Sequence, residues 1–154
     1  MNNLREKLKN FLGENIKNKN QIAVSTCRLM LAAIKDRDIE SRTKNKNNEI
    51  SDTDIFNLLQ GMIKQRKESM DIYKKAGREE LKIREENEID IIKFFLPKQL
   101  TDEELRDIVN EECNEVQAKT IKDLGKLMNV LREKYPGQLD LKKAANLGKT
   151  ILSK

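Results

Sequence analysis

Apolar residues recur at helical spacing along almost the whole chain. In the first segment Leu4, Leu8, Leu12 and Ile16 are four residues apart, which places them on one stripe of a helix. No stretch shows the sustained alternation of apolar and polar residues that marks a half-buried strand. The chain has only 2 Pro and 6 Gly among 154 residues, too few for the turns of a many-stranded sandwich or barrel. The sequence therefore predicts an all-α protein.

Local start and stop signals divide this pattern into seven expected helices, at about residues 4–16, 21–42, 51–76, 78–96, 101–116, 120–135 and 140–152. Three helix starts match a capping box, in which a hydroxyl and a carboxylate satisfy free backbone amides: Ser51 with Asp54, Thr101 with Glu104, and Thr120 with Asp123. Gly77 and Pro136 are stop signals. The inward stripes are expected to include Ile16, Leu81 and Ile121.

The strongest boundary in the sequence is Pro97, which lacks an amide donor and restricts the backbone of the residue before it. We therefore expect an N-terminal four-helix domain at residues 1–96 and a linker at 97–100. A C-terminal three-helix bundle is expected at 101–154.

Composition removes several kinds of active site. The chain contains no His, which excludes hydrolase triads that need an imidazole and two-histidine metal sites. Glycine-rich phosphate loops of the usual nucleotide-binding types are absent as well. No cofactor, no metal and no small-molecule substrate are therefore expected, and the chain is predicted not to be an enzyme.

Cysteines and acidic clusters are assigned structural roles at this stage. Cys27 and Cys113 each lie in an apolar segment without a companion ligand, and both are expected to be thiols in the core. The acidic cluster of Glu85, Glu86, Glu88 and Asp90 lacks the histidines of a di-metal site and is expected to form a solvated face.

The first 20 residues alternate charged and apolar side chains, and no apolar run approaches the length of a membrane span. The protein is expected to be cytoplasmic and to have no contact with a membrane. The matrix of an organelle is the alternative if a targeting segment precedes this sequence.

The net charge of +5 is unevenly distributed along the chain. Residues 101–115 carry a net charge of −6, whereas residues 116–154 carry +6. The basic segment permits an anionic partner without requiring one.

Three lysines of the basic segment, Lys119, Lys122 and Lys126, have spacings of three and four that place them on one face of the predicted sixth helix. They form either a solvated stripe or a set of phosphate contacts. Gly125 costs about 1 kcal/mol relative to Ala inside a helix. Either close helix packing or the close approach of a partner's backbone explains that cost. Gly148 is expected to pack against a neighbouring helix.

The N-terminal half offers weaker signals for nucleic acid. Its basic residues Arg28, Lys35, Arg42, Lys64, Arg66 and Lys67 are explained by ion pairs with acids of adjacent helices. A second nucleic-acid footprint there ranks below the C-terminal one. The few aromatic residues are scattered and mostly at core spacing, so a stacking platform for unpaired bases is not expected.

Four blocks of the sequence match a known family in the same order. They are STCRLMLAAI from Ser25, LLQGMIKQRKESMDIYKKAGREEL from Leu58, EIDIIKFFLPKQLTDEEL from Glu88 and KDLGKLMNVL from Lys122. Together they resemble the GatB/YqeY family, and in particular its free-standing YqeY-like members. The resemblance covers nearly the whole chain.

This resemblance implies an all-helical protein similar to the tail of the B subunit of the tRNA-dependent amidotransferase. In that enzyme the tail holds tRNA at its elbow, and amide transfer and ATP chemistry belong to other domains. One segment departs from the family pattern. Leu141 stands where the family usually has Gly, and Lys143 stands at an apolar position. The start of the last helix is therefore expected to be shaped differently.

The function predicted from the sequence is a non-catalytic tRNA-binding or tRNA-handling module, accessory to an aminoacyl-tRNA synthetase or an amidotransferase. Its candidate contacts with the tRNA elbow and backbone are Lys119, Lys122, Gly125, Lys126, Lys142, Lys143 and Lys149. Two alternatives stay open. One is a helical adaptor between proteins. The other is a participant in glutamine-dependent carbon–nitrogen ligation, which is disfavoured because neither an activated nucleophile nor an ATP site is visible.

Overall fold

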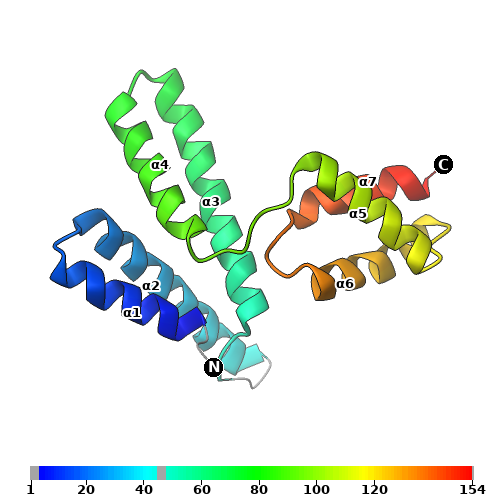
Figure 1. The fold of residues 1–154 in the computed structure, drawn as a ribbon, viewed down its shortest axis with the longest axis horizontal. Coiled ribbons are helices and arrows are strands. Elements are labelled where there is room, and N and C mark those ends of the chain that lie inside the picture. Colours follow the sequence, from blue (N-terminus) through cyan, green and yellow to red (C-terminus); the bar gives the residue numbers. More distant parts are fainter. Residues whose placement is uncertain (1–3, 45–47, 154) are drawn as a thin grey trace. The chain divides into compact units, whose positions relative to one another are not determined.

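The computed structural model describes residues 4–44 and 48–153, and over these residues the chain is helical without a strand (Figure 1). Its elements are α1 (Leu4–Lys17), α2 (Gln21–Lys44), α3 (Asp52–Lys75), α4 (Glu79–Lys93), α5 (Asp102–Glu115), the 3₁₀ turn η1 (Ile121–Asp123), α6 (Leu124–Lys134) and α7 (Leu141–Leu152). The prediction of an all-α protein is confirmed. The contacts divide the chain into two compact units, unit 1 (Met1–Leu96) and unit 2 (Pro97–Lys154).

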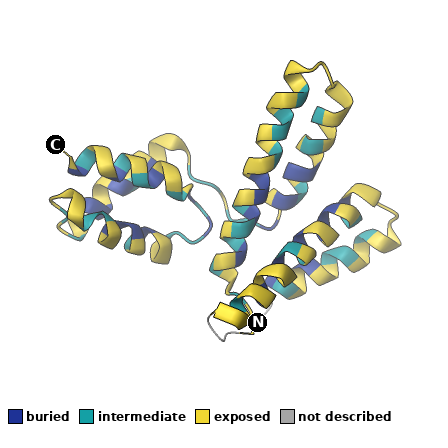
Figure 2. Ribbon diagram, turned by 180° about the vertical axis from the view of Figure 1, so that it is seen from behind, coloured by how far each residue is buried: buried dark blue, intermediate teal, exposed yellow. Residues whose placement is uncertain are grey.

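Unit 1 consists of the hairpins α1–α2 and α3–α4, and α2 also packs against α4. Buried residues follow one stripe of each helix and exposed residues occupy the opposite face (Figure 2). The fully buried side chains at the centre of the core include Leu8, Met30, Leu59 and Ile92. Burial of such side chains supplies most of the stability of short helices.

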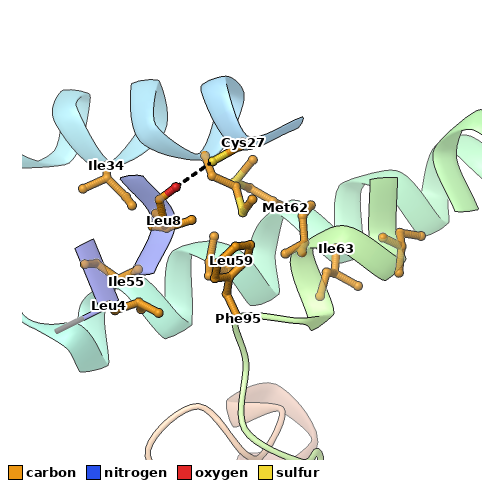
Figure 3. Packing of buried hydrophobic residues seen from close by; sticks show 12 residues of the cluster. Leu4, Leu8, Cys27, Ile34, Ile55, Leu59, Met62, Ile63 and Phe95 are labelled. Atoms are coloured by element: carbon orange, nitrogen blue, oxygen red, sulfur yellow. Dashed lines mark hydrogen bonds between the residues drawn. The ribbon is translucent and has the colours of Figure 1, made fainter. Parts of the chain in front are cut away.

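Both cysteines lie in the core as unpaired thiols, as the sequence predicts. The Sγ atom of Cys27 donates a hydrogen bond of 3.3 Å to the backbone oxygen of Leu8, which joins α2 to α1 (Figure 3). Burial raises the pKa of both the Cys27 and the Cys113 thiol. The neutral thiol is therefore the stable form at each position.

Ion pairs of the half-buried Arg5 and Arg66 join the helices of unit 1. Arg5 of α1 forms a two-pronged pair with Asp38 of α2, with both nitrogen–oxygen distances at 2.8 Å. Arg66 of α3 lies 3.1 Å from Glu88 of α4. The expected ion pair is thus present for Arg66, and Glu88 is buried rather than part of a solvated face.

The other basic residues assigned to ion pairs do not form them. Within the part of the chain that the structure describes, Arg28, Lys35, Arg42, Lys64 and Lys67 have no carboxylate within ion-pair distance. Arg42 instead donates to the backbone oxygen of Asn48 at 3.2 Å. Those charges remain available to solvent or to a partner.

Unit 2 packs α5, α6 and α7 around a second core of fully or almost fully buried side chains: Leu105, Val109, Cys113, Leu127, Met128, Leu131, Leu139, Ala144 and Leu152. The backbone N–H of Leu100 donates to the oxygen of Gln138 at 2.8 Å, which ties the start of this unit to the loop before α7. No residue of this cluster belongs to the core of unit 1.

Three residues assigned to inward stripes are exposed instead. The exposed fractions are 49 % for Ile16, 38 % for Leu81 and 52 % for Ile121. Each lies within the first or last turn of its element, or in the 3₁₀ turn. No described helix has both the length and the apolar character needed to cross a bilayer.

Candidate nucleic-acid interface

Three of the predicted contact residues lie in the segment that leads from α5 into α6, each in a different kind of secondary structure. Lys119 lies in the loop, Lys122 in η1 and Lys126 in α6, and all three are exposed. The expectation that they share one face of a continuous helix is wrong, because the α-helix starts only at Leu124. The lysines instead follow a tight turn that leads into the helix.

Asp123 gives this turn its shape. One carboxylate oxygen accepts hydrogen bonds from the backbone N–H groups of Lys119 at 2.9 Å and Thr120 at 3.1 Å. The predicted capping box is therefore present. These two hydrogen bonds, together with the nearby charge of Lys126, hold the pKa of Asp123 below its usual value. The carboxylate faces the backbone of the turn and leaves the lysine side chains unpaired.

Gly125 lies in the first turn of α6 and is exposed. A Cβ atom built there would meet nothing within 4 Å. Close helix packing, one of the two interpretations of this residue, is therefore wrong. The surface above Gly125, between Lys122 and Lys126 in the sequence, is open to an approaching partner.

Gly148 of α7 has the opposite surroundings. A Cβ atom there would lie 2.8 Å from Cδ1 of Leu124 and 3.1 Å from Cδ2 of Leu127. The prediction that Gly148 packs against a neighbouring helix is confirmed. This contact also brings the C-terminal half of α7 against the first turn of α6.

Helix α7 begins at an N-cap of ordinary geometry. Oδ1 of Asp140 accepts from the backbone N–H groups of Lys142 at 2.9 Å and Lys143 at 3.3 Å. Leu141, which replaces the usual Gly of the family pattern, is half-buried in the core of unit 2. The Asp140 cap thus starts the helix without a glycine.

The structure separates the seven candidate residues into two groups. Lys149 follows Gly148, and α7 also contacts η1, so Lys149 lies at the same end of unit 2 as the lysine turn. We call Lys119, Lys122, Gly125, Lys126 and Lys149 the lysine turn group. Lys142 and Lys143 lie at the other end of α7, about 10 Å away along the helix axis.

The available positive charge differs between these residues. Lys143 is paired with Asp102 at 3.2 Å. Among the described residues, the four lysines of the lysine turn group and Lys142 have no acidic partner within ion-pair distance. Their ammonium groups are exposed and can contact a phosphate without first breaking an ion pair.

Lys134 shows why charge alone does not identify a contact. This residue belongs to the same basic segment, yet its Nζ lies 3.0 Å from both oxygens of Glu112, whose side chain is only 5 % exposed. The hydrogen bond and the negative charge of Glu112 raise the pKa of Lys134. Its charge neutralises a buried acid of α5.

A second feature that sequence reasoning missed lies in unit 1. Phe11, Phe94 and Phe95 form a cluster with ring centroids 5.0 to 5.7 Å apart. Nζ of Lys7 lies 4.8 Å from the centroid of the Phe94 ring. The expectation that the aromatic residues are scattered is therefore wrong for these three of the six. Only the adjacency of Phe94 and Phe95 was visible in the sequence, because Phe11 lies more than 80 residues earlier.

Acidic and thiol groups do not assemble into a metal centre over residues 4–44 and 48–153, where no cluster of three or more metal-ligating side chains occurs.

Comparison with known proteins relates this chain to a family and to a protein of another organism. A family model described as "Yqey-like protein" matches residues 5–152. A protein of Schizosaccharomyces pombe, described as uncharacterised, is 28 % identical over 96 residues, which cover 62 % of this chain and 74 % of that protein.

Proposed function

Because this chain belongs to the YqeY-like protein family, which matches it over residues 5–152, we propose that it is a non-catalytic tRNA-binding module. It acts beside an aminoacyl-tRNA synthetase or an amidotransferase. The resemblance to the tail of the amidotransferase B subunit supports a tRNA ligand, and the surface chemistry of unit 2 supports a phosphate backbone.

The observation that carries this proposal is the lysine turn group. Three exposed lysines without ion-pair partners, Lys119, Lys122 and Lys126, lie within six residues of an exposed glycine at the start of α6. A fourth, Lys149, follows the glycine through which α7 packs against the start of α6. Long cationic side chains bind phosphates, and a position without a side chain lets the RNA backbone come close to the helix. Asp123, the one acid within this turn, is bonded to backbone amides and does not neutralise the lysines.

The expected mode of recognition is shape and backbone rather than base sequence. Double-stranded RNA offers its phosphates and 2′-hydroxyl groups, and its deep major groove is closed to side chains. Unit 2 presents charge on a compact helical surface. The lysine turn group is therefore expected to follow a phosphate ridge of folded tRNA.

A binding titration tests the proposal. The double variant Lys122→Gln/Lys126→Gln removes two exposed charges without disturbing the core. When the logarithm of the binding constant is plotted against the logarithm of the salt concentration, each lost phosphate contact makes the slope less steep by about 0.7 to 0.9. We expect the variant to bind tRNA more weakly at low salt, with a slope reduced by about 1.5.

The matched control is Lys64→Gln/Lys67→Gln on α3, which removes the same charge from two exposed and unpaired lysines of unit 1. A DNA duplex of similar length is the control for shape. An equal loss of affinity in both variants, or equal affinity of the wild type for tRNA and DNA, would reduce the interaction to general electrostatics. Absence of tRNA binding at low salt would instead direct the search to protein partners.

A further inference from the structure

The aromatic cluster of unit 1 combines an exposed ring with a fixed positive charge. Phe94 is 59 % exposed, although it is a large apolar side chain. Lys7 of α1 places its ammonium over this ring and 5.7 Å from the centroid of the Phe95 ring. The buried member of the cluster is Phe95, which is 2 % exposed, so most of the Phe94 ring lies outside the core that Phe95 joins.

We propose that Phe94 and Lys7 form a binding site in unit 1 for an unpaired RNA base and its phosphate. The base stacks on the exposed Phe94 ring and the Lys7 ammonium contacts the adjoining phosphate. This inference rests on the proposed RNA-binding function and extends it from the backbone contacts of unit 2 to a stacking contact of unit 1.

The Phe94 ring is held in place from several sides. Its residue is the C-cap of α4, and its backbone N–H donates to the oxygens of Asp90 and Ile91, both at 3.3 Å. Phe95 meets it edge to face with centroids 5.2 Å apart. Phe11 lies at 5.7 Å on the α1 side. A ring positioned in this way loses little conformational freedom when a base stacks on it.

The charge over the ring selects the chemistry of the ligand. An ammonium already at 4.8 Å repels a second cation, which argues against a methylammonium ligand of the aromatic-cage type. A nucleotide matches both parts of the site, since every base has a π face and every phosphate is negative. Lys93, in the last turn of α4, offsets the partial negative charge of that helix end.

The chain contains no Trp, so Phe94→Trp introduces a single indole at the proposed stacking position. We expect titration with a short oligouridine, whose bases are unstacked, to quench the fluorescence of this indole. The matched control is Ile72→Trp on α3, where the replaced side chain is 65 % exposed and lies outside the aromatic cluster. Its fluorescence is expected to stay unchanged in the same titration.

Three further variants separate stacking from charge in the wild-type background. Phe94→Ala is expected to weaken oligouridine binding about 5- to 150-fold without changing the salt slope, the range that loss of one stacked base implies. Phe94→Leu should give a similar loss, and it preserves apolar volume if the Ala variant folds poorly. Lys7→Gln is expected to lower the salt slope by about 0.7.

Four results would overturn the inference. In the first, oligouridine binds but leaves the fluorescence of Phe94→Trp unchanged. In the second, oligouridine quenches the fluorescence of Ile72→Trp as strongly as that of Phe94→Trp. The third is a blue shift with vesicles of anionic phospholipid and no response to RNA, which would assign the ring to a lipid surface. Full tRNA affinity in Phe94→Ala, combined with loss in Lys122→Gln/Lys126→Gln, would refute this site and leave the proposed function intact.

Discussion

At the scale of single residues, the two glycines of α6 and α7 have opposite structural meanings. Gly125 is exposed with no neighbour within 4 Å of a built Cβ atom, whereas Gly148 is buried against two leucines. Both are helical and neither has a positive φ angle. Packing therefore explains Gly148, whereas no packing contact among the described residues requires a glycine at position 125.

Replacing Gly125 by Ala should separate stability from binding. We expect Gly125→Ala to stabilise the protein by about 0.5–1 kcal/mol, because Ala favours the helix and nothing obstructs its methyl group. The same variant should bind tRNA more weakly if the RNA backbone approaches this position. Urea unfolding and a tRNA titration measure the two effects. Gly148→Ala is the control, and its crowded site should cancel the gain in stability; an equal gain there would contradict the packing argument.

The pair of Arg5 and Asp38 predicts a specific dependence of stability on pH. The hydrogen bond from Arg5 holds the pKa of Asp38 below its usual value, with a further contribution from the backbone N–H of Ile50. A lowered pKa in the folded state means that the carboxylate stabilises the protein above about pH 4, its unfolded value. This contribution is lost as the pH falls through the folded pKa.

We expect Asp38→Asn to be less stable than wild type by about 3 kcal/mol at pH 7, because it removes the buried charge partner of Arg5 and leaves only the longer contact of 3.8 Å with the exposed Glu49. The difference should shrink as the pH falls below 4. Urea unfolding between pH 3 and pH 7 measures it. Glu40→Gln, which removes the exposed partner of Lys44, should change stability little at any pH. A constant difference for Asp38→Asn across this range would contradict the assignment.

At the scale of elements, the starts of the helices were the most predictable features. Ser51 and Thr101 are N-caps as predicted, and each hydroxyl accepts from the backbone N–H three residues later. Gly77 follows α3 with a φ angle of 70°, as expected for a helix stop. These features depend on interactions within one helical turn, so the local sequence is sufficient to predict them.

The cap of α5 gives a test at this scale. Thr101→Ala removes the acceptor for the Glu104 N–H and should destabilise the protein by about 1 kcal/mol. Thr101→Ser keeps the hydroxyl and should lie close to the wild type. Chemical denaturation compares the three proteins. Equal destabilisation by Ala and Ser would show that the methyl group of Thr101, rather than its cap, contributes the stability.

The ends and connections of elements were predicted less well. The fourth helix ends at Lys93, three residues before its expected end at residue 96, and the sixth begins with η1 rather than a regular helix. In each place the backbone satisfies its hydrogen bonds in a tighter turn. Apolar spacing continues through these turns, and periodicity alone does not distinguish them from an α-helix.

At the scale of the whole molecule, units 1 and 2 each contain a separate hydrophobic cluster. Leu59 belongs to the first and Leu131 to the second, and both side chains are fully buried. Replacing such a side chain by Ala lowers the free energy of unfolding of its own unit by about 2–5 kcal/mol. The separation of the clusters predicts that this loss stays within one unit.

Hydrogen exchange tests this expectation. In Leu131→Ala the amides of α5, α6 and α7 should lose protection, and those of α1 to α4 should keep it. Leu59→Ala should give the reverse pattern. Mass spectrometry of peptides after exchange resolves the two units. Loss of protection throughout the chain in either variant would show that both units unfold in one step.

Part of the surroundings of the candidate residues was predictable. The spacing predicts that Lys122 and Lys126 are exposed, and both are, although Lys122 lies in η1 rather than in the expected helix. The grouping of Lys149 with the lysine turn was not predictable from the sequence, because it depends on the contact of Gly148 in α7 with Leu124 in α6. The neutralisation of Lys134 by Glu112 likewise joins residues 22 positions apart.

The sequence by itself determined the helical class, the starts of most helices and the resemblance to the family, because periodicity, caps and motif order are properties of neighbouring residues. Only the tertiary structure decided which charges are free, which glycine is enclosed and that three phenylalanines meet beside Lys7. Burial and pairing depend on side chains brought together from distant positions. Local spacing contains no information about which distant residue will cover a given face.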